Sequence, residues 1–169
     1  AVRLRGYRSG SRGASGDRTL GDGAVAHVSL ADPMCDVLRK ILAESFADAA
    51  FAETRLHTEG TYVCIEGPQF STLAESLTYQ QLGYAVIGMT AMPEAKLARQ
   101  AELCYATVAM VTDYDCWHPD HDHVDVASVI RVLLANAEKG QTLVRRVLPA
   151  LMSRPAACPH GCDSALGNA

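Results

Sequence analysis

The chain has 169 residues, of which 49% are hydrophobic and 20% charged, a balance typical of one folded domain. Its formal net charge of −4 gives no electrostatic reason to expect a nucleic acid as partner. No apolar run approaches the roughly 20 residues that a membrane span requires. No apolar stretch follows the arginines near the N-terminus, so we expect no secretory signal and a cytoplasmic location.

The first segment, residues 1–24, is rich in Arg, Gly and Ser and has neither helical nor strand periodicity. Such a stretch cannot bury enough apolar surface to offset its backbone entropy. We therefore predict a disordered tail, with a basic binding arm as the alternative, and a folded part that comprises residues 25–169.

The folded part is expected to begin with a helix at Asp32 and Pro33, which suit the cap and the first turn. Apolar side chains then recur at helical spacing, namely Val37, Leu38, Ile41 and Leu42. Residues 54–57 and 61–65 are predicted strands. Ser71 is the expected cap of a second helix that runs to Leu82.

The pattern of strand and helix then repeats. We predict strands at 84–87 and 105–111, helices at 93–103 and 126–148, and a polar loop at 112–123. On the last helix, Val129, Ile130, Leu133 and Leu134 share one face. This alternation predicts an α/β fold, in which helices flank a sheet.

Ligand-binding groups in such folds gather where strands end and helices begin. The three junctions of this kind are residues 66–71, 88–90 and 112–117. Each places polar or aromatic side chains directly after an apolar strand. Taken separately these signals are weak, because an acid after a strand is most often a helix cap.

Six cysteines invite a metal or a disulfide interpretation. Cys35, Cys64 and Cys104 lie in apolar patterns, where a thiol usually packs as a small hydrophobe. Cys158 and Cys162 have three residues between them, not the two typical of zinc knuckles. We predict reduced thiols and no metal site, and leave a Cys158–Cys162 bridge open as an alternative.

A second group of metal-binding side chains, His118, His121 and His123, lies among aspartates in the polar loop. No fixed ligand spacing is met. We interpret this segment as a solvated loop beside the functional site.

Three motifs in order resemble the methylthioadenosine phosphorylases of the trimeric purine nucleoside phosphorylase family, and the resemblance covers residues 25–168. The motifs are Val63-Cys64-Ile65-Glu66-Gly67-Pro68, Met89-Thr90-Ala91-Met92-Pro93-Glu94-Ala95 and Ala109-Met110-Val111-Thr112-Asp113-Tyr114-Asp115-Cys116-Trp117. The resemblance implies a purine nucleoside phosphorylase-like mixed sheet flanked by helices, without its N-terminal strands. It implies a pentosyltransferase that cleaves 5′-methylthioadenosine with inorganic phosphate into adenine and 5-methylthioribose 1-phosphate. It further implies a homotrimer that needs no cofactor.

The resemblance assigns the central roles to two aspartates. Asp113 would protonate purine N7 as the glycosidic bond breaks, because negative charge accumulates on the departing base. That role requires a carboxyl kept protonated by burial under Trp117 and Phe70. Asp115 would accept a hydrogen bond from the adenine 6-amino group. Relatives that cleave inosine and guanosine carry Asn where this chain has Asp113.

The remaining roles follow from motif position. Phe70 would pack on the purine, Ser71 would contact it, Met89 would lie under the ribose, and Thr90 would donate to phosphate. His27 would lie near the 5′ end of the sugar, where Val126 and Val129 would form an apolar wall for the methylthio group. An unpaired hydroxyl would be disfavoured against such a wall.

The family's other phosphate-binding segments are a Gly-rich loop after the first strand, an Arg-His pair and a Thr-Ala-Cys-Gly-Ser sequence. None of them occurs in residues 1–23. We therefore keep two alternatives to a phosphorylase: a non-catalytic α/β fragment with a residual purine pocket, and a hydrolytic methylthioadenosine nucleosidase.

Overall fold

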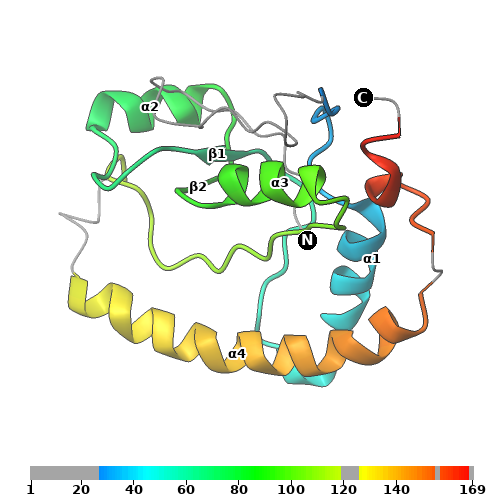
Figure 1. The fold of residues 1–169 in the computed structure, drawn as a ribbon. Helices are drawn as coiled ribbons and strands as arrows, with labels where there is room; N and C mark the ends of the chain where they lie inside the picture. Colours follow the sequence, from blue (N-terminus) through cyan, green and yellow to red (C-terminus); the bar gives the residue numbers. More distant parts are fainter. Residues whose placement is uncertain (1–26, 119–125, 155–156, 168–169) are drawn as a thin grey trace.

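The computed structural model describes residues 27–118, 126–154 and 157–167 (Figure 1). The tail predicted for residues 1–24 lies outside them. In chain order the elements are α1 (Asp36–Ser45), η1 (Ala49–Phe51), β1 (Tyr62–Cys64), α2 (Leu73–Gln81), β2 (Val86–Gly88), α3 (Ala91–Gln100), α4 (Val126–Met152) and η2 (Cys162–Ser164). The alternation of strands and helices confirms the predicted α/β class. No helix in the described ranges is long and apolar enough to cross a membrane.

The sheet that these residues form has two parallel strands. Tyr62 pairs with Val86 and Cys64 with Gly88. Beyond the last pair, the Ile65 amide donates a 2.9 Å hydrogen bond to the Gly88 carbonyl. Helix α2 makes the crossover between the strands, so both strands end at the same edge of the sheet.

Two of the predicted strands are not formed. Residues 54–57 have no regular structure, and residues 105–111 run half-buried to exposed without joining a ladder. A strand forms only where its backbone groups pair with those of a neighbour, and in the described sheet β1 and β2 pair only with each other. The backbone of 105–111 instead contacts the start of α1, where the Cys35 amide donates to the Tyr105 carbonyl at 2.7 Å.

This contact also corrects the predicted start of the first helix. Cys35 is the N-cap residue in an extended conformation, so α1 begins at Asp36 rather than at Asp32 and Pro33. A tertiary hydrogen bond from Cys35 to Tyr105 fixes the backbone there. The local capping signal at Asp32 is therefore overridden.

The second helix, α2, is capped by Thr72, one residue after the predicted cap Ser71. The hydroxyl of Thr72 accepts a hydrogen bond from the Glu75 amide, and the carboxylate of Glu75 accepts one from the Thr72 amide, which completes a capping box. Ser71 is consequently left outside the helix. The third helix starts at Ala91, which places Pro93 in its first turn, where proline is tolerated.

The long helix α4 packs on α1 through its C-terminal half only. Leu143 and Val147 are buried against Phe51, with Ile41 and Phe46 beside them. The predicted apolar face nearer the N-terminus of α4 remains largely open, with Ile130, Leu133 and Leu134 between 50% and 65% exposed. Figure 1 shows this half of α4 extending away from α1.

Candidate functional site

The first two junctions meet at the carboxyl edge of the sheet. Gly67 has φ +68, the left-handed region that glycine tolerates, and a Cβ atom there would lie 2.6 Å from the sulfur of Met89. The parallel register of β1 and β2 produces this contact, because both segments leave the sheet at adjacent positions.

The third junction joins the first through helix α2. The hydroxyl of Ser76, a residue that is 1% exposed, donates a 2.7 Å hydrogen bond to Asp115 Oδ2. The thiol of Cys116 lies 3.6 Å from the carbonyl oxygen of Ser71. The structure therefore brings together all three segments that the sequence singled out, although the strand expected before the third is not formed.

A pocket of about 140 Å³ opens beside this contact. Its lining residues come from the first junction and α2: Ile65, Glu66, Gly67, Gln69, Phe70, Ser71, Glu75 and Tyr79. The Oγ atom of Ser71 is buried and has no hydrogen-bond partner among the residues that the structure describes. Because Thr72 caps α2, this hydroxyl is not used to cap the helix. A buried hydroxyl without a partner is costly, and a bound polar ligand would satisfy it.

The two aspartates have different surroundings. Asp115 is half-buried and accepts from the Ser76 hydroxyl and, at 2.9 Å, from the Cys116 amide. Asp113 is exposed and accepts from the Thr112 hydroxyl at 2.6 Å. The burial of Asp113 expected under Phe70 and Trp117 is not formed among the described residues, where Asp113 is exposed and Phe70 is itself 73% exposed. Phe70 follows the cis Gly67–Pro68 peptide bond, outside α2 and free of core packing.

Aromatic rings follow Asp113 and Asp115. Tyr114 stacks on His118 with ring centroids 4.4 Å apart, and Trp117 meets Tyr114 edge-on at 6.2 Å. His118 therefore belongs to an aromatic cluster. His121 and His123 lie outside the described residues.

The α3 N-terminus lies at the second junction. Thr90 is its exposed N-cap residue, and its side chain makes no capping hydrogen bond. Tyr62 extends from β1 toward this end. Burial raises the pKa of Tyr62, and hydrogen bonds from the backbone of Ala91 and Thr90 lower it by less.

Of the predicted site residues whose side chains the structure describes, only Phe70 and Ser71 line the pocket. His27 is exposed, Val129 is half-buried on α4, and neither lines the pocket. The side chain of Val126 lies outside the described residues. Met89 is half-buried and touches Gly67 at the edge of the pocket.

A separate cluster was missed by the sequence analysis. The sulfur atoms of Cys35, Cys104, Cys158 and Cys162 all lie within 4.8 Å of one another, and all are free thiols. Burial raises the pKa of Cys35 and of Cys162. Burial also acts to raise the pKa of Cys158, but hydrogen bonds from the backbone of Cys162 and His160 outweigh it and lower the value to about 7. Spacing within the Cys158–Cys162 segment gave no hint of the two distant partners.

The sequence of this chain is similar to those of known proteins. A sequence profile described as the phosphorylase superfamily matches residues 3–149. S-methyl-5′-thioadenosine phosphorylase of Bradyrhizobium diazoefficiens is 58% identical over 150 residues, which are 89% of this chain and 50% of that protein. The enzyme of the same name from Rhodospirillum rubrum is 57% identical with the same coverage. The chain thus spans about half the length of these curated relatives.

Solved structures share the fold. A methylthioadenosine phosphorylase from an antarctic soil metagenomic library has a TM-score of 0.85 and 43% identity, covering 99% of this chain and 57% of that one. A methylthioadenosine phosphorylase from Schistosoma mansoni, in complex with adenine, has a TM-score of 0.82 and 26% identity, covering 98% of this chain and 64% of that one. A mutant of the Schistosoma mansoni adenosine/methylthioadenosine phosphorylase, in complex with methylthioadenosine, has a TM-score of 0.79 and 26% identity, covering 98% and 62%.

Proposed function

Because this chain belongs to the phosphorylase superfamily, we propose that its three junctions, residues 66–71, 88–90 and 112–117, form the purine half of a methylthioadenosine phosphorylase site. The whole protein would convert 5′-methylthioadenosine and phosphate into adenine and 5-methylthioribose 1-phosphate, as the names of its relatives suggest. The observation that carries this proposal is the pairing of Asp115 with Ser76, next to a pocket where the buried Ser71 hydroxyl has no partner.

Asp115 is the proposed reader of the base. A carboxylate offers about four acceptor positions, and two are used by Ser76 and Cys116. The remaining capacity suits the two N–H donors of the adenine 6-amino group. A 6-oxo purine would place one acceptor against another, so the site would reject it.

Asp113 is the proposed proton donor to purine N7. The Thr112 hydroxyl donates to one of its oxygens and would orient the other toward the base. In this chain the carboxyl is exposed, so the burial that keeps it protonated would come from the bound purine and from protein segments outside the described residues. General acid catalysis of this kind contributes roughly 10²–10⁴-fold to rate.

Inorganic phosphate is the proposed co-substrate, and no cofactor is required. Thr90 supports this assignment, because its hydroxyl is exposed at the N-terminus of α3 without a capping role and helix N-termini attract anions. Met89 would then underlie the ribose between the purine and phosphate groups. Phe70 would pack on the purine.

The 5′ end of the substrate would require a neighbouring subunit. We propose a homotrimer in which His27, Val126 and Val129 complete the methylthio pocket at an interface. The open apolar face of α4, with Ile130 and Leu134 at least half exposed, is compatible with burial against another subunit.

The test is incubation of the chain with methylthioadenosine, with and without phosphate, followed by chromatography of adenine and sugar products. Phosphate-dependent release of adenine together with 5-methylthioribose 1-phosphate supports the proposal, and an Asp113→Asn variant should slow that release. Adenine release that does not require phosphate would replace phosphorolysis with hydrolysis. Binding of adenine without turnover would restrict the function of this chain to a purine pocket.

A further inference from the structure

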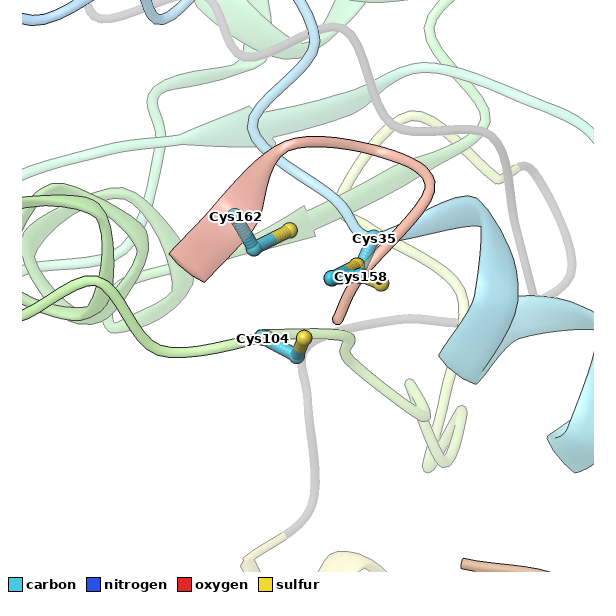
Figure 2. A group of neighbouring side chains, drawn as sticks. All are labelled: Cys35, Cys104, Cys158 and Cys162. Carbon is cyan, nitrogen blue, oxygen red and sulfur yellow. Dashed lines mark hydrogen bonds between the residues drawn. The ribbon is translucent and has the colours of Figure 1, made fainter. Parts of the chain in front are cut away.

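The four-cysteine cluster (Cys35, Cys104, Cys158 and Cys162) lies away from the proposed purine site. We propose that it binds one structural zinc ion. Figure 2 shows the four thiols directed toward a common centre from the start of α1, the segment after α3 and the C-terminal turn. Three of the four cysteines are buried and Cys104 is half-buried.

The distances fit a tetrahedral thiolate site. With zinc–sulfur bonds of about 2.3 Å, neighbouring sulfurs of a tetrahedron lie about 3.8 Å apart. The sulfurs of Cys35 and Cys158 are 3.7 Å apart, and no pair in the cluster exceeds 4.8 Å. A disulfide requires a sulfur–sulfur distance of about 2.05 Å. Shifts of less than about 1 Å in each sulfur would close the cluster around zinc, whereas a disulfide between any two of these cysteines requires a larger approach of the two sulfurs.

The local backbone explains how Cys158 and Cys162 can both be ligands although three residues lie between them. Gly161 adopts φ +71 and its amide donates to the Cys158 carbonyl at 2.8 Å, which folds the chain back on itself. The carboxylate of Asp163 accepts from the Cys158 amide at 2.9 Å. This tight turn places the sulfurs of Cys158 and Cys162 on the same side.

Hydrogen-bond donors surround the sulfurs, as at metal-thiolate centres, where outer contacts orient the ligands. The guanidinium of Arg154 lies 3.2 Å from the Cys104 sulfur. The backbone of Leu38 hydrogen-bonds to the thiol of Cys35, and that of His160 to Cys158. A zinc ion with four thiolates carries a net charge of −2, which the Arg154 cation would partly offset.

Packing of the four thiols without a metal explains the position of residues 157–167 less well than zinc binding does. Among the described residues of the C-terminal segment 157–167, only Cys158 and Cys162 are buried. Two small side chains provide little apolar burial to hold eleven residues against α1. A zinc ion would fasten this segment to Cys35 and Cys104. Since all four ligands come from the protein, the site would have no open position, which is typical of structural rather than catalytic zinc.

The experiment measures metal bound to the intact chain, purified under reducing conditions from zinc-supplemented medium. We expect about one zinc per chain by mass spectrometry, and cobalt replacement should give a thiolate-to-metal charge-transfer band with tetrahedral d–d bands. The Cys162→Ser and Cys104→Ser variants should lose the metal. The matched controls Cys64→Ser, buried outside the cluster, and Cys116→Ser, exposed, should keep it.

The cobalt titration on the unaltered chain keeps the test valid if a variant fails to fold. Absence of both zinc and the cobalt bands in the folded chain would overturn the proposal. Disulfide bonds among these four cysteines under the same reducing conditions would overturn the proposal as well. They would be detected as a loss of two hydrogens per bond in the mass of the intact chain. Adenine release plays no part in either readout, so the zinc proposal and the proposed function can fail independently.

Discussion

The hydroxyl of Ser76 donates a 2.7 Å hydrogen bond to the carboxylate of Asp115, 39 residues further along the chain. Ser76 lies on α2 and is 1% exposed, so this bond fixes the segment after residue 111 against the helix that borders the pocket. A weaker contact, between the Cys116 thiol and the Ser71 carbonyl, joins the same segment to the first junction.

Replacement of Ser76 by alanine should therefore lower the free energy of unfolding. A hydrogen bond to a charged group contributes about 1.5–3 kcal/mol, and half-exposure of Asp115 places the expected loss near the lower limit. Urea denaturation followed by the single tryptophan, Trp117, measures it. The control is Ser45→Ala, which removes only a bond to the Ile41 carbonyl within α1 and should have little effect. Equal losses in the two variants would contradict this role of Ser76.

The close approach of Gly88 to Tyr62 gives a second prediction. A Cβ atom at position 88 would lie 1.9 Å from the Tyr62 hydroxyl, so Gly88→Ala should destabilise the protein by about 1–3 kcal/mol through overpacking. Adding Tyr62→Phe removes the clashing oxygen and should restore part of the loss. The control Gly140→Ala meets only the flexible end of Met110 and gains helix propensity. No recovery in the double variant would show that the clash is not the cause.

The ionisation of Tyr105 gives a pH dependence with a defined sign. Burial, together with a 2.6 Å hydrogen bond to Glu94, raises the pKa of Tyr105 from 10.0 to about 12. Between these values the unfolded chain has lost the phenolic proton and the folded chain retains it. Stability from this group is therefore complete below pH 10 and is lost as the pH rises toward 12.

Spectrophotometric titration of the folded protein should accordingly show a late phenolate component that Tyr105→Phe removes. Unfolding free energies measured across the same interval should fall less steeply in that variant. If the variant and the original chain have identical alkaline titration curves, the hydrogen bond between Tyr105 and Glu94 does not exist in solution.

The fold class could be predicted from sequence because strand and helix patterns alternate strongly. Element limits were less accurate where tertiary contacts decide them. The Cys35–Tyr105 backbone bond shifts the start of α1, and the capping box at Thr72 excludes Ser71 from α2. The first contact leaves no mark within a short window of sequence, whereas the Thr72–Glu75 capping box is a local pattern that the spacing of these two residues could have indicated.

Residues 105–111 show a further limit. Their apolar, β-branched composition predicts a buried strand, but β structure also requires pairing with another strand, and within the described residues this segment joins no ladder. The site segments were found because strand ends are a general place for ligands. The cysteine cluster was missed because its members come from positions up to 127 residues apart, between Cys35 and Cys162.

The central claim is that Asp115 reads the amino group of adenine, and equilibrium binding of adenine and hypoxanthine to the chain tests it most directly. Isothermal titration calorimetry measures the affinities for adenine and hypoxanthine of three proteins: the original chain, Asp115→Asn and the control Glu138→Gln, which removes an exposed charge. We predict that the original chain and the control bind adenine more tightly than hypoxanthine. Asp115→Asn should weaken adenine binding by about 10–100-fold, the equivalent of one hydrogen bond to a charged group. The same variant should have a smaller ratio of adenine affinity to hypoxanthine affinity. Adenine binding of equal strength in the original chain and Asp115→Asn, or no preference for adenine in the original chain, would contradict the account.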